Sequence, residues 1–171
     1  RIKNINLQVH RGEIVGVAGV NGNGQNFLCD AIIGYQKLDE GKILLNGEDI
    51  TDKTIQERIK SGISYVPSDR QRFGLILSMK LEENMLLKSS FDNTWVKHGL
   101  IDYKRLSKYT SEKIRDYDIK ATGPESLAGS LSGGNQQKVA IAKWIEPEPK
   151  VFLLDEPTRG VDVGAKHEIY E

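Results

Sequence analysis

The sequence has 171 residues, a single cysteine, and 24 basic against 24 acidic side chains. This length fits one ordinary domain that buries a real core. The zero net charge argues against nucleic acid as a dominant partner. Because Cys29 is the only cysteine, an internal disulfide is excluded, and the apolar neighbours of Cys29 predict a buried thiol. No apolar run approaches the roughly 18 to 20 residues of a membrane-spanning helix.

The first part of the chain predicts strands that flank a glycine-rich loop. Alternating apolar residues predict a strand near residues 5–9, and the apolar run 14–18 predicts a buried strand. A glycine-rich loop at 19–24 follows, and after it a helix is predicted over residues 26–33. Gly34 is expected to end that helix.

Three more elements are predicted before residue 70. Residues 42–45, followed by an Asn-Gly pair, predict a strand and a tight turn. A helix over residues 54–60 is expected to stop at Gly62, and residues 63–66 predict another strand. The pattern is that of an α/β fold.

The middle of the chain is predicted to be mainly helical. Long helical stretches run from about residue 81 to residue 145, and the apolar run 151–154 returns to the sheet as a central strand. The middle is therefore expected to be a helical insertion in an α/β core. The sequence opens at Arg1 within a strand-like pattern and stops at Glu171 within a helix-like one, which predicts a piece of a longer polypeptide, truncated at both ends.

Residues 19–24 form the first candidate site. They match the first six positions of the phosphate-loop pattern Gly-x-x-x-x-Gly-Lys-(Ser/Thr), in which backbone N–H groups and a helix start attract phosphate. Gln25 stands in the lysine position and Asn26 in the hydroxyl position, so the usual cation is missing, while the Asn26 carbonyl is a candidate metal ligand. A plain glycine turn is the alternative. The predicted nucleotide-binding residues here are Gly19, Asn21, Gly22, Asn23, Gly24, Gln25 and Asn26.

Two carboxylates follow the apolar run 151–154 directly. A buried strand places Asp155 at the carboxyl edge of the sheet, where an aspartate can hold Mg²⁺. The neighbouring Glu156 can position or deprotonate an attacking water, which makes it the candidate catalytic residue. The alternative is a solvated strand end.

A second helix start with small residues lies at Ser132. Ser132 is a good N-cap, and Gly133 and Gly134 leave the backbone bare. Such a start is a second anion site. A single nucleotide in one chain rarely needs two phosphate-facing helix starts, so each half of a dimer is expected to supply one of them.

At these residues the chain resembles the ATP-binding cassette (ABC) ATPases. Residues 131–136 look like the family signature, residues 151–156 like the Walker B strand, and residues 158–162 like the D-loop. The resemblance implies a P-loop NTPase cassette. It consists of a RecA-like α/β core (residues 1–78 and 149–171) with an inserted helical subdomain (residues 79–148). It also makes Asn135 and Asp162 nucleotide-binding residues and puts Ser68 where the family has a metal-binding glutamine.

The branch of the family that the chain most resembles implies a particular function. Its members are second nucleotide-binding domains of bacterial sugar importers of the ribose/galactose type, or nucleoside importers, and commonly have a lysine-less phosphate loop. The resemblance implies ATP and Mg²⁺ as cofactors, and the first cassette and transmembrane permease subunits as partners. A periplasmic or lipoprotein substrate-binding protein would take part indirectly. Nucleic acid is not expected as a partner. The implied location is the cytoplasmic face of the bacterial membrane.

Two alternatives remain at this point. One is a non-catalytic half-cassette that only completes the active site of its partner; the Glu156 carboxylate argues against it, since such a half has no use for that group. The other is an ABC ATPase of chromosome maintenance or translation. The absence of sustained heptads and the zero net charge disfavour that class.

Overall fold

The computed structural model describes residues 3–20, 22–89, 94–145 and 149–170. Backbone contacts divide the chain into two units. Unit 1 holds residues 1–65 and 150–155, and unit 2 holds residues 66–149 and 156–171. The assignment of residues 79–148 alone to a helical subdomain stays a prediction.

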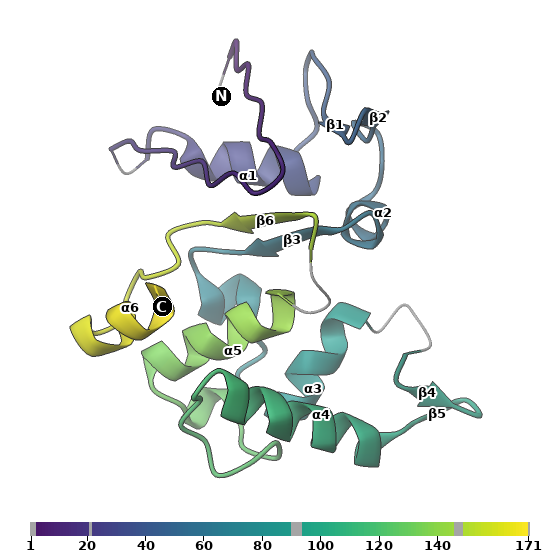
Figure 1. The fold of residues 1–171 in the computed structure, drawn as a ribbon, viewed down its shortest axis with the longest axis vertical. Coiled ribbons are helices and arrows are strands. Elements are labelled where there is room, and N and C mark those ends of the chain that lie inside the picture. Colours follow the sequence, from purple (N-terminus) through teal and green to yellow (C-terminus); the bar gives the residue numbers. More distant parts are fainter. Residues whose placement is uncertain (1–2, 21, 90–93, 146–148, 171) are drawn as a thin grey trace. The chain divides into compact units, whose positions relative to one another are not determined.

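A pair of strands forms the centre of unit 1. Strand β3 (Ile63–Val66) pairs with β6 (Val151–Leu154), and the two arrows run in the same direction in Figure 1. Both strands were predicted at these residues. Because side chains alternate along a strand, every second residue of each strand joins one core with helices α1 (Gln25–Ile33) and α2 (Ile55–Lys60). Its members include Ile33, Ile59, Ile63, Tyr65, Val151 and Leu153.

Glycines end both helices of unit 1, as the sequence predicts. Helix α1 stops where Gly34 takes a left-handed φ of 97°. Helix α2 begins with a capping box between Thr54 and Glu57, and Gly62 follows its end with a φ of 106°. These local signals are strong because an L-residue resists a positive φ.

The Asn46-Gly47 turn also forms where it is predicted. It joins β1 (Leu44–Leu45) to β2 (Glu48–Asp49) in an antiparallel hairpin. Asn46 and Gly47 have φ values of 51° and 82°, as the tightest hairpin turns require. The strand itself is shorter than predicted, since residues 42 and 43 are not part of it.

The two strands predicted near the start of the chain are wrong in this structure. Residues 5–9 and 14–18 form no strand, and Ile14 is 98% exposed although a buried strand was expected. A strand is stabilised by its ladder partners, and the described part of the chain offers none to these segments. The β3–β6 pair therefore has no further strand beside it among the described residues, and β6 is not central.

Unit 2 is mainly helical, as predicted. It contains helices α3 (Leu81–Leu86), α4 (Tyr103–Asp116), α5 (Gly133–Ile145) and α6 (Val163–Tyr170). Single-turn helices lie at Arg70–Gly74 (η1, π-helical), Leu87–Ser89 (η2) and Ala128–Ser130 (η3). Apolar side chains of α3, α4 and α5 are almost fully buried, among them Leu81, Met85, Leu106, Val139 and Ala142.

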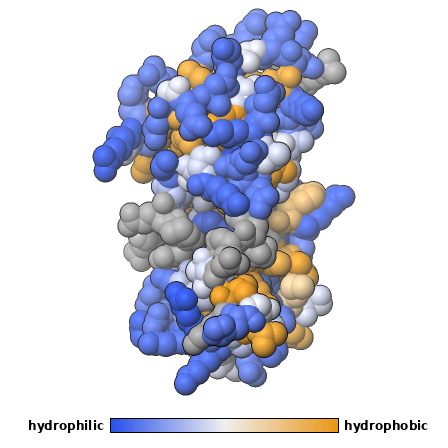
Figure 2. Space-filling view, turned by 90° about the vertical axis from the view of Figure 1, so that its right-hand side faces the viewer, coloured by the Kyte–Doolittle hydropathy of each residue, from blue (hydrophilic) through white to orange (hydrophobic). Residues whose placement is uncertain are grey.

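A short hairpin in unit 2 was missed. Strands β4 (Val96–Lys97) and β5 (Leu100–Ile101) pair antiparallel through His98 and Gly99, which have φ values of 52° and 81°. Apolar side chains gather in the lower part of Figure 2. Leu100 of β5 is 75% exposed. Within the described residues, none of the helices has the length and apolar character needed to span a bilayer.

One buried arginine closes the C-terminal end of α1. Arg58 of α2 is 3% exposed, and its Nη1 donates to the carbonyls of Ala31 (2.7 Å) and Ile32 (2.8 Å). Its Nε donates to the carbonyl of Lys53 (3.0 Å). The last carbonyls of a helix have no hydrogen-bond partner within the helix. This guanidinium therefore donates to acceptors that would otherwise be buried and unsatisfied.

The substitution Arg58→Met tests this arrangement, because it keeps an apolar stem and removes all the donors. We expect the free energy of unfolding to fall by about 3 kcal/mol, the upper range for hydrogen bonds to a charged group. Urea denaturation measures it. Arg115→Met is the matched control, since Arg115 is exposed and, among the described residues, its ion pair is with Asp116 alone. Equal effects of the two substitutions would contradict the role of Arg58.

Candidate functional site

The glycine-rich loop leads directly into α1. Gly22 and Gly24 have φ values of 89° and 102°, and no side chain caps the first turn of α1. The N–H groups of that turn are therefore available to an anion. Gln25 folds back on the loop: its Nε2 donates to the carbonyl of Val20 (3.2 Å) and lies where a side chain at Gly19 would be. Asn21 lies outside the described residues.

The loop thus fits a phosphate through its backbone alone. Asn23 donates its N–H to the carbonyl of Val20 (3.1 Å), which closes the turn before the helix. Helix dipole and free N–H groups attract an anion, but no side-chain cation contributes at position 25. Weak nucleotide binding by this loop therefore remains a prediction, which rests on the missing cation at position 25.

Asp155 follows β6 directly and is only 8% exposed. The hydroxyl of Tyr65, from the neighbouring strand, donates to Asp155 Oδ2 over 3.4 Å. Burial and the charge of Asp155 raise the pKa of Asp30 on α1 and, more strongly, that of Tyr65. Unit 1 therefore concentrates negative charge at the carboxyl edge of its strand pair.

Asn26 lies on the α1 face that carries this charge. Asn26 and Asp30 are four residues apart and share one face of the helix. Among the described residues no three His, Cys, Asp or Glu side chains gather around a possible metal position. Mg²⁺ takes one or two protein ligands and completes its shell with phosphate and water. Asp155 and Asn26 are the candidates, while Ser68 lies half-buried in unit 2.

Ser132 caps the start of α5, as predicted. Its side chain is exposed, and its Oγ accepts from the backbone N–H of Asn135 (3.5 Å) and from Asn135 Nδ2 (2.9 Å). The carbonyl of Ser132 accepts the first helical bond, from Gln136 (2.9 Å). Asn135 Oδ1 also accepts the N–H of Lys120 (2.7 Å). The serine end of this helix is therefore open to solvent rather than buried.

The two glycines after Ser132 are closely packed. A Cβ at Gly133 would lie 2.6 Å from Arg70 Nη2, and one at Gly134 would lie 2.4 Å from the Cβ of Ala165 on α6. The bare backbone thus makes room for neighbouring elements, a reason that the sequence analysis missed. A hollow of about 200 Å³ remains at this helix start, lined by Lys120, Ser132, Gly134, Asn135, Asp162, Gly164, Ala165 and Glu168. Four of the predicted site residues therefore meet in unit 2.

Two acidic site residues adopt defined local positions. Asp162 Oδ1 accepts the N–H of Ala165 (3.0 Å), so this carboxylate caps α6. Glu156 has a φ of 45°, which is unusual for a residue with a side chain, and Oε2 of Glu156 lies 3.3 Å from Arg159 Nη1. Backbone strain of this kind persists where the surroundings enforce it, often at functional sites.

A buried lysine joins α5 to α6. Lys138 Nζ lies 2.6 Å from Glu168 Oε2 and donates to the carbonyl of Asp118 (2.9 Å). Lys138, Glu168 and the buried Arg70 were not predicted as site residues. The sequence pattern does not mark Lys138, because its partners Glu168 and Asp118 lie on other segments of the chain.

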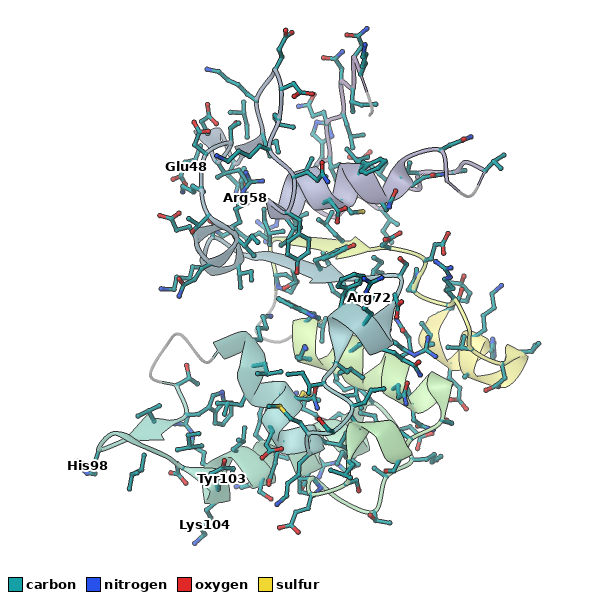
Figure 3. The ribbon with its side chains drawn as sticks, turned by 180° about the vertical axis from the view of Figure 1, so that it is seen from behind. Glu48, Arg58, Arg72, His98, Tyr103 and Lys104 are labelled. Atoms are coloured by element: carbon teal, nitrogen blue, oxygen red, sulfur yellow. The ribbon has the colours of Figure 1, made fainter. Side chains whose placement is uncertain are left out.

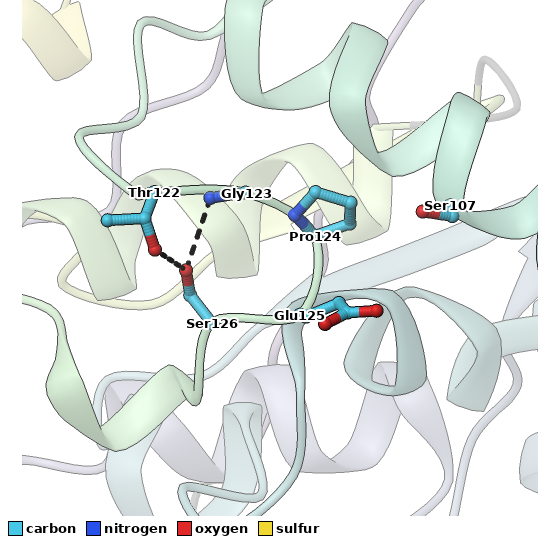
Figure 4. Close-up of a pocket in the computed structure, with 6 residues that line it drawn as sticks. All are labelled: Ser107, Thr122, Gly123, Pro124, Glu125 and Ser126. Carbon is cyan, nitrogen blue, oxygen red and sulfur yellow. Dashed lines mark hydrogen bonds between the residues drawn. The ribbon is translucent and has the colours of Figure 1, made fainter.

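A larger hollow of about 450 Å³ lies elsewhere in unit 2 (Figure 4). Ser126 Oγ accepts the N–H of Gly123 (3.3 Å) and hydrogen-bonds to the hydroxyl of Thr122 (2.8 Å) there. It contains none of the predicted site residues. Its lining is Ser107, Thr122, Gly123, Pro124, Glu125 and Ser126.

Comparison with known proteins identifies the family. The family model described as "ABC transporter" matches residues 2–159. The chain therefore belongs to the ABC transporter family and has the fold of its ATP-binding cassettes, which are P-loop NTPases.

The chain is similar to curated import proteins. It is 46% identical over 169 residues to the ribose import ATP-binding protein RbsA of Lactococcus lactis subsp. cremoris (strain SK11). It is 40% identical over 171 residues to the nucleoside import ATP-binding protein NupA of Lactococcus lactis subsp. cremoris (strain MG1363). These alignments cover 99% and 100% of this chain. The chain spans about a third, 34%, of the length of these relatives.

The fold of the chain is similar to that of solved ATP-binding cassettes. The ATP-binding cassette MJ0796, in a dimeric post-hydrolysis state bound to ADP and Pi, aligns with a TM-score of 0.78 and 27% identity. The alignment covers 97% of this chain and 70% of that one. The sequence-based prediction of an ABC cassette is thus confirmed, while the roles of individual site residues stay predictions.

The single cysteine offers a test of the unit 1 site. Burial, and next the charges of Asp155 and Asp30, raise the pKa of the Cys29 thiol from 9.0 to about 11. A raised thiol pKa means less thiolate at a given pH, so alkylation of the folded protein should be slow. At pH 8 we expect native Cys29 to react with iodoacetamide about a hundredfold more slowly than the urea-unfolded chain, the effect of two pKa units on the thiolate fraction.

The pH profile provides the control for that experiment. The native rate should rise steeply up to about pH 11, whereas the unfolded rate should level off near pH 9, the ordinary pKa of the group. Equal native and unfolded rates at pH 8 would show that Cys29 and the charges around it are not arranged as described.

Proposed function

We propose that this chain is the second ATP-binding cassette of a bacterial importer and that it completes an ATP site held mainly by the first cassette. The observation that carries the proposal is the exposed, Ser132-capped start of α5, which opens on the hollow lined by Gly134, Asn135 and Asp162. Free N–H groups and a helix dipole at this start suit the γ-phosphate of a nucleotide bound by another half. The dimeric state of the solved MJ0796 cassette supports such a pairing.

The chain's own nucleotide site is proposed to be weak. Backbone N–H groups of residues 22–26 would hold the phosphates, and Asp155 with Asn26 would hold Mg²⁺. When bound, Mg²⁺ neutralises charge that develops on the phosphates. Glu156, next to Asp155, would orient or deprotonate the attacking water. Without a lysine at position 25, a charged hydrogen bond worth about 1.5–3 kcal/mol is missing.

The transport role is proposed from the relatives. Both curated relatives are named as import ATP-binding proteins, one for ribose and one for nucleosides. By analogy this chain would energise uptake of a sugar or a nucleoside, together with transmembrane permease subunits and, indirectly, a substrate-binding protein. It would act at the cytoplasmic face of the membrane. Closure of two cassettes on ATP would drive the permease between its inward-facing and outward-facing states.

A non-catalytic half-cassette is the second candidate. The amide of Gln25 turned onto Val20 and the ion pair of Glu156 with Arg159 favour it, because both groups are engaged within the chain. A calorimetric titration of the purified chain with MgATP separates the candidates. Heat of binding that Asp155→Asn abolishes would favour the nucleotide-binding cassette, and no heat would favour the half that serves only its partner.

The substitution Ser132→Arg tests the shared site. A large cation at the open helix start would block the approach of another cassette, so we expect MgATP hydrolysis by the complete protein to fall by about a hundredfold or more. The isolated chain should hydrolyse little ATP with either residue. Ser111→Arg is the matched control, since Ser111 is exposed on α4 away from the hollow. Full activity of Ser132→Arg would disprove the shared site.

A further inference from the structure

A buried guanidinium in unit 2 links three segments that are far apart in the sequence. Arg70, the first residue of η1, is 8% exposed. Its Nη1 donates to the carbonyl of Arg159 (2.8 Å), and its Nη2 donates to the carbonyl of Gly160 (3.1 Å). The same Nη2 lies 2.6 Å from the place where a Cβ at Gly133 would be. One side chain therefore touches both the turn before α6 and the start of α5.

The charge of Arg70 is not used for an ion pair in the described residues. Burial lowers the pKa of Arg70, and the nearby charge of Asp69 offsets part of that effect. The Nε of Arg70 is buried without a hydrogen-bond partner among the described residues. Burying a cation in this way costs free energy, and an apolar side chain of similar size would fill the space at lower cost. We therefore attribute the arginine at this position to its two forked hydrogen-bond donors and not to the space that its side chain fills.

The turn that begins at Arg70 is attached to α5 along its length. Gln71 Nε2 donates to Gln136 Oε1 (3.0 Å), one turn into the helix. Near the end of α5, Lys143 Nζ donates to the carbonyl of Gly74 (2.5 Å). With Arg70 at the helix start, residues 70–74 follow α5 from its first turn to its last. A displacement of this π-helical turn would shift the helix start as well.

We propose that Arg70 is a positioning residue, which holds the 159–160 turn against the start of α5 and so sets the geometry with which Ser132 and Asp162 meet a nucleotide. This inference rests on the proposed function of that helix start. Arg70 contacts no nucleotide itself; it acts through the two carbonyls that it binds. Gly133 is required beside it, since any side chain there would meet the guanidinium.

The test uses the complete protein and the variants Arg70→Gln and Arg70→Lys. Arg70→Gln removes the fork, so kcat for MgATP hydrolysis should fall by about ten- to a hundredfold, the cost of a displaced reacting geometry. KM should stay within about twofold, because Arg70 does not touch the nucleotide. Arg70→Lys keeps the charge but has a single donor nitrogen in place of the fork, and should restore part of kcat. Arg72→Gln is the matched control: Arg72 is exposed in the same turn (Figure 3) and should leave both constants unchanged.

Amide hydrogen exchange gives a readout that a general loss of stability would not reproduce. In Arg70→Gln the amides of residues 159–162 should exchange about tenfold faster, while those of α4 stay unchanged. Faster exchange in α4 as well, or an unchanged kcat in Arg70→Gln while Ser132→Arg is inactive, would overturn the positioning role. If Ser132→Arg is also fully active, the shared site itself is disproved and the role of Arg70 falls with it.

Discussion

The absence of a Cβ at two consecutive glycines, Gly133 and Gly134, determines the packing around the start of α5. Next to Gly133 lies the guanidinium of Arg70, and next to Gly134 lies Ala165 of α6, both closer than a Cβ would allow. The helix start is therefore enclosed on two sides by its own chain. Ser132 stays exposed, and its hydroxyl stabilises the first turn. The result is an anion-attracting end that is open in one direction, which suits the proposed site completed from another half.

The fold could be predicted where short-range chemistry decides the backbone. The ends of α1 and α2 and the turn between β1 and β2 follow from glycine and asparagine at positions that need a positive φ. Runs of mostly apolar residues also predicted β3 and β6, although β6 is only partly buried and its last residue, Leu154, is 46% exposed. The same rule was wrong for residues 14–18, because an apolar run predicts a strand but does not provide a partner for it.

The candidate site was only partly visible in the sequence. Motif positions such as Ser132 and Asp155 stand out because their residue types and spacing are unusual. The groups that hold them do not, since their contacts join residues far apart: Tyr65 reaches Asp155 across 90 positions, and Arg70 reaches Gly160 across 90 as well. An arginine that donates to backbone carbonyls leaves no complementary charge in the sequence to search for. Such positioning contacts exist only in the folded chain.

The most direct test is a structure of the complete protein with a non-hydrolysable MgATP analogue. The account predicts that Ser132 Oγ and the first N–H groups of α5 lie at hydrogen-bond distance, about 2.7–3.2 Å, from the γ-phosphate of a nucleotide bound by the other cassette. A structure in which this helix start faces solvent or protein, with the nucleotide held entirely elsewhere, would contradict it.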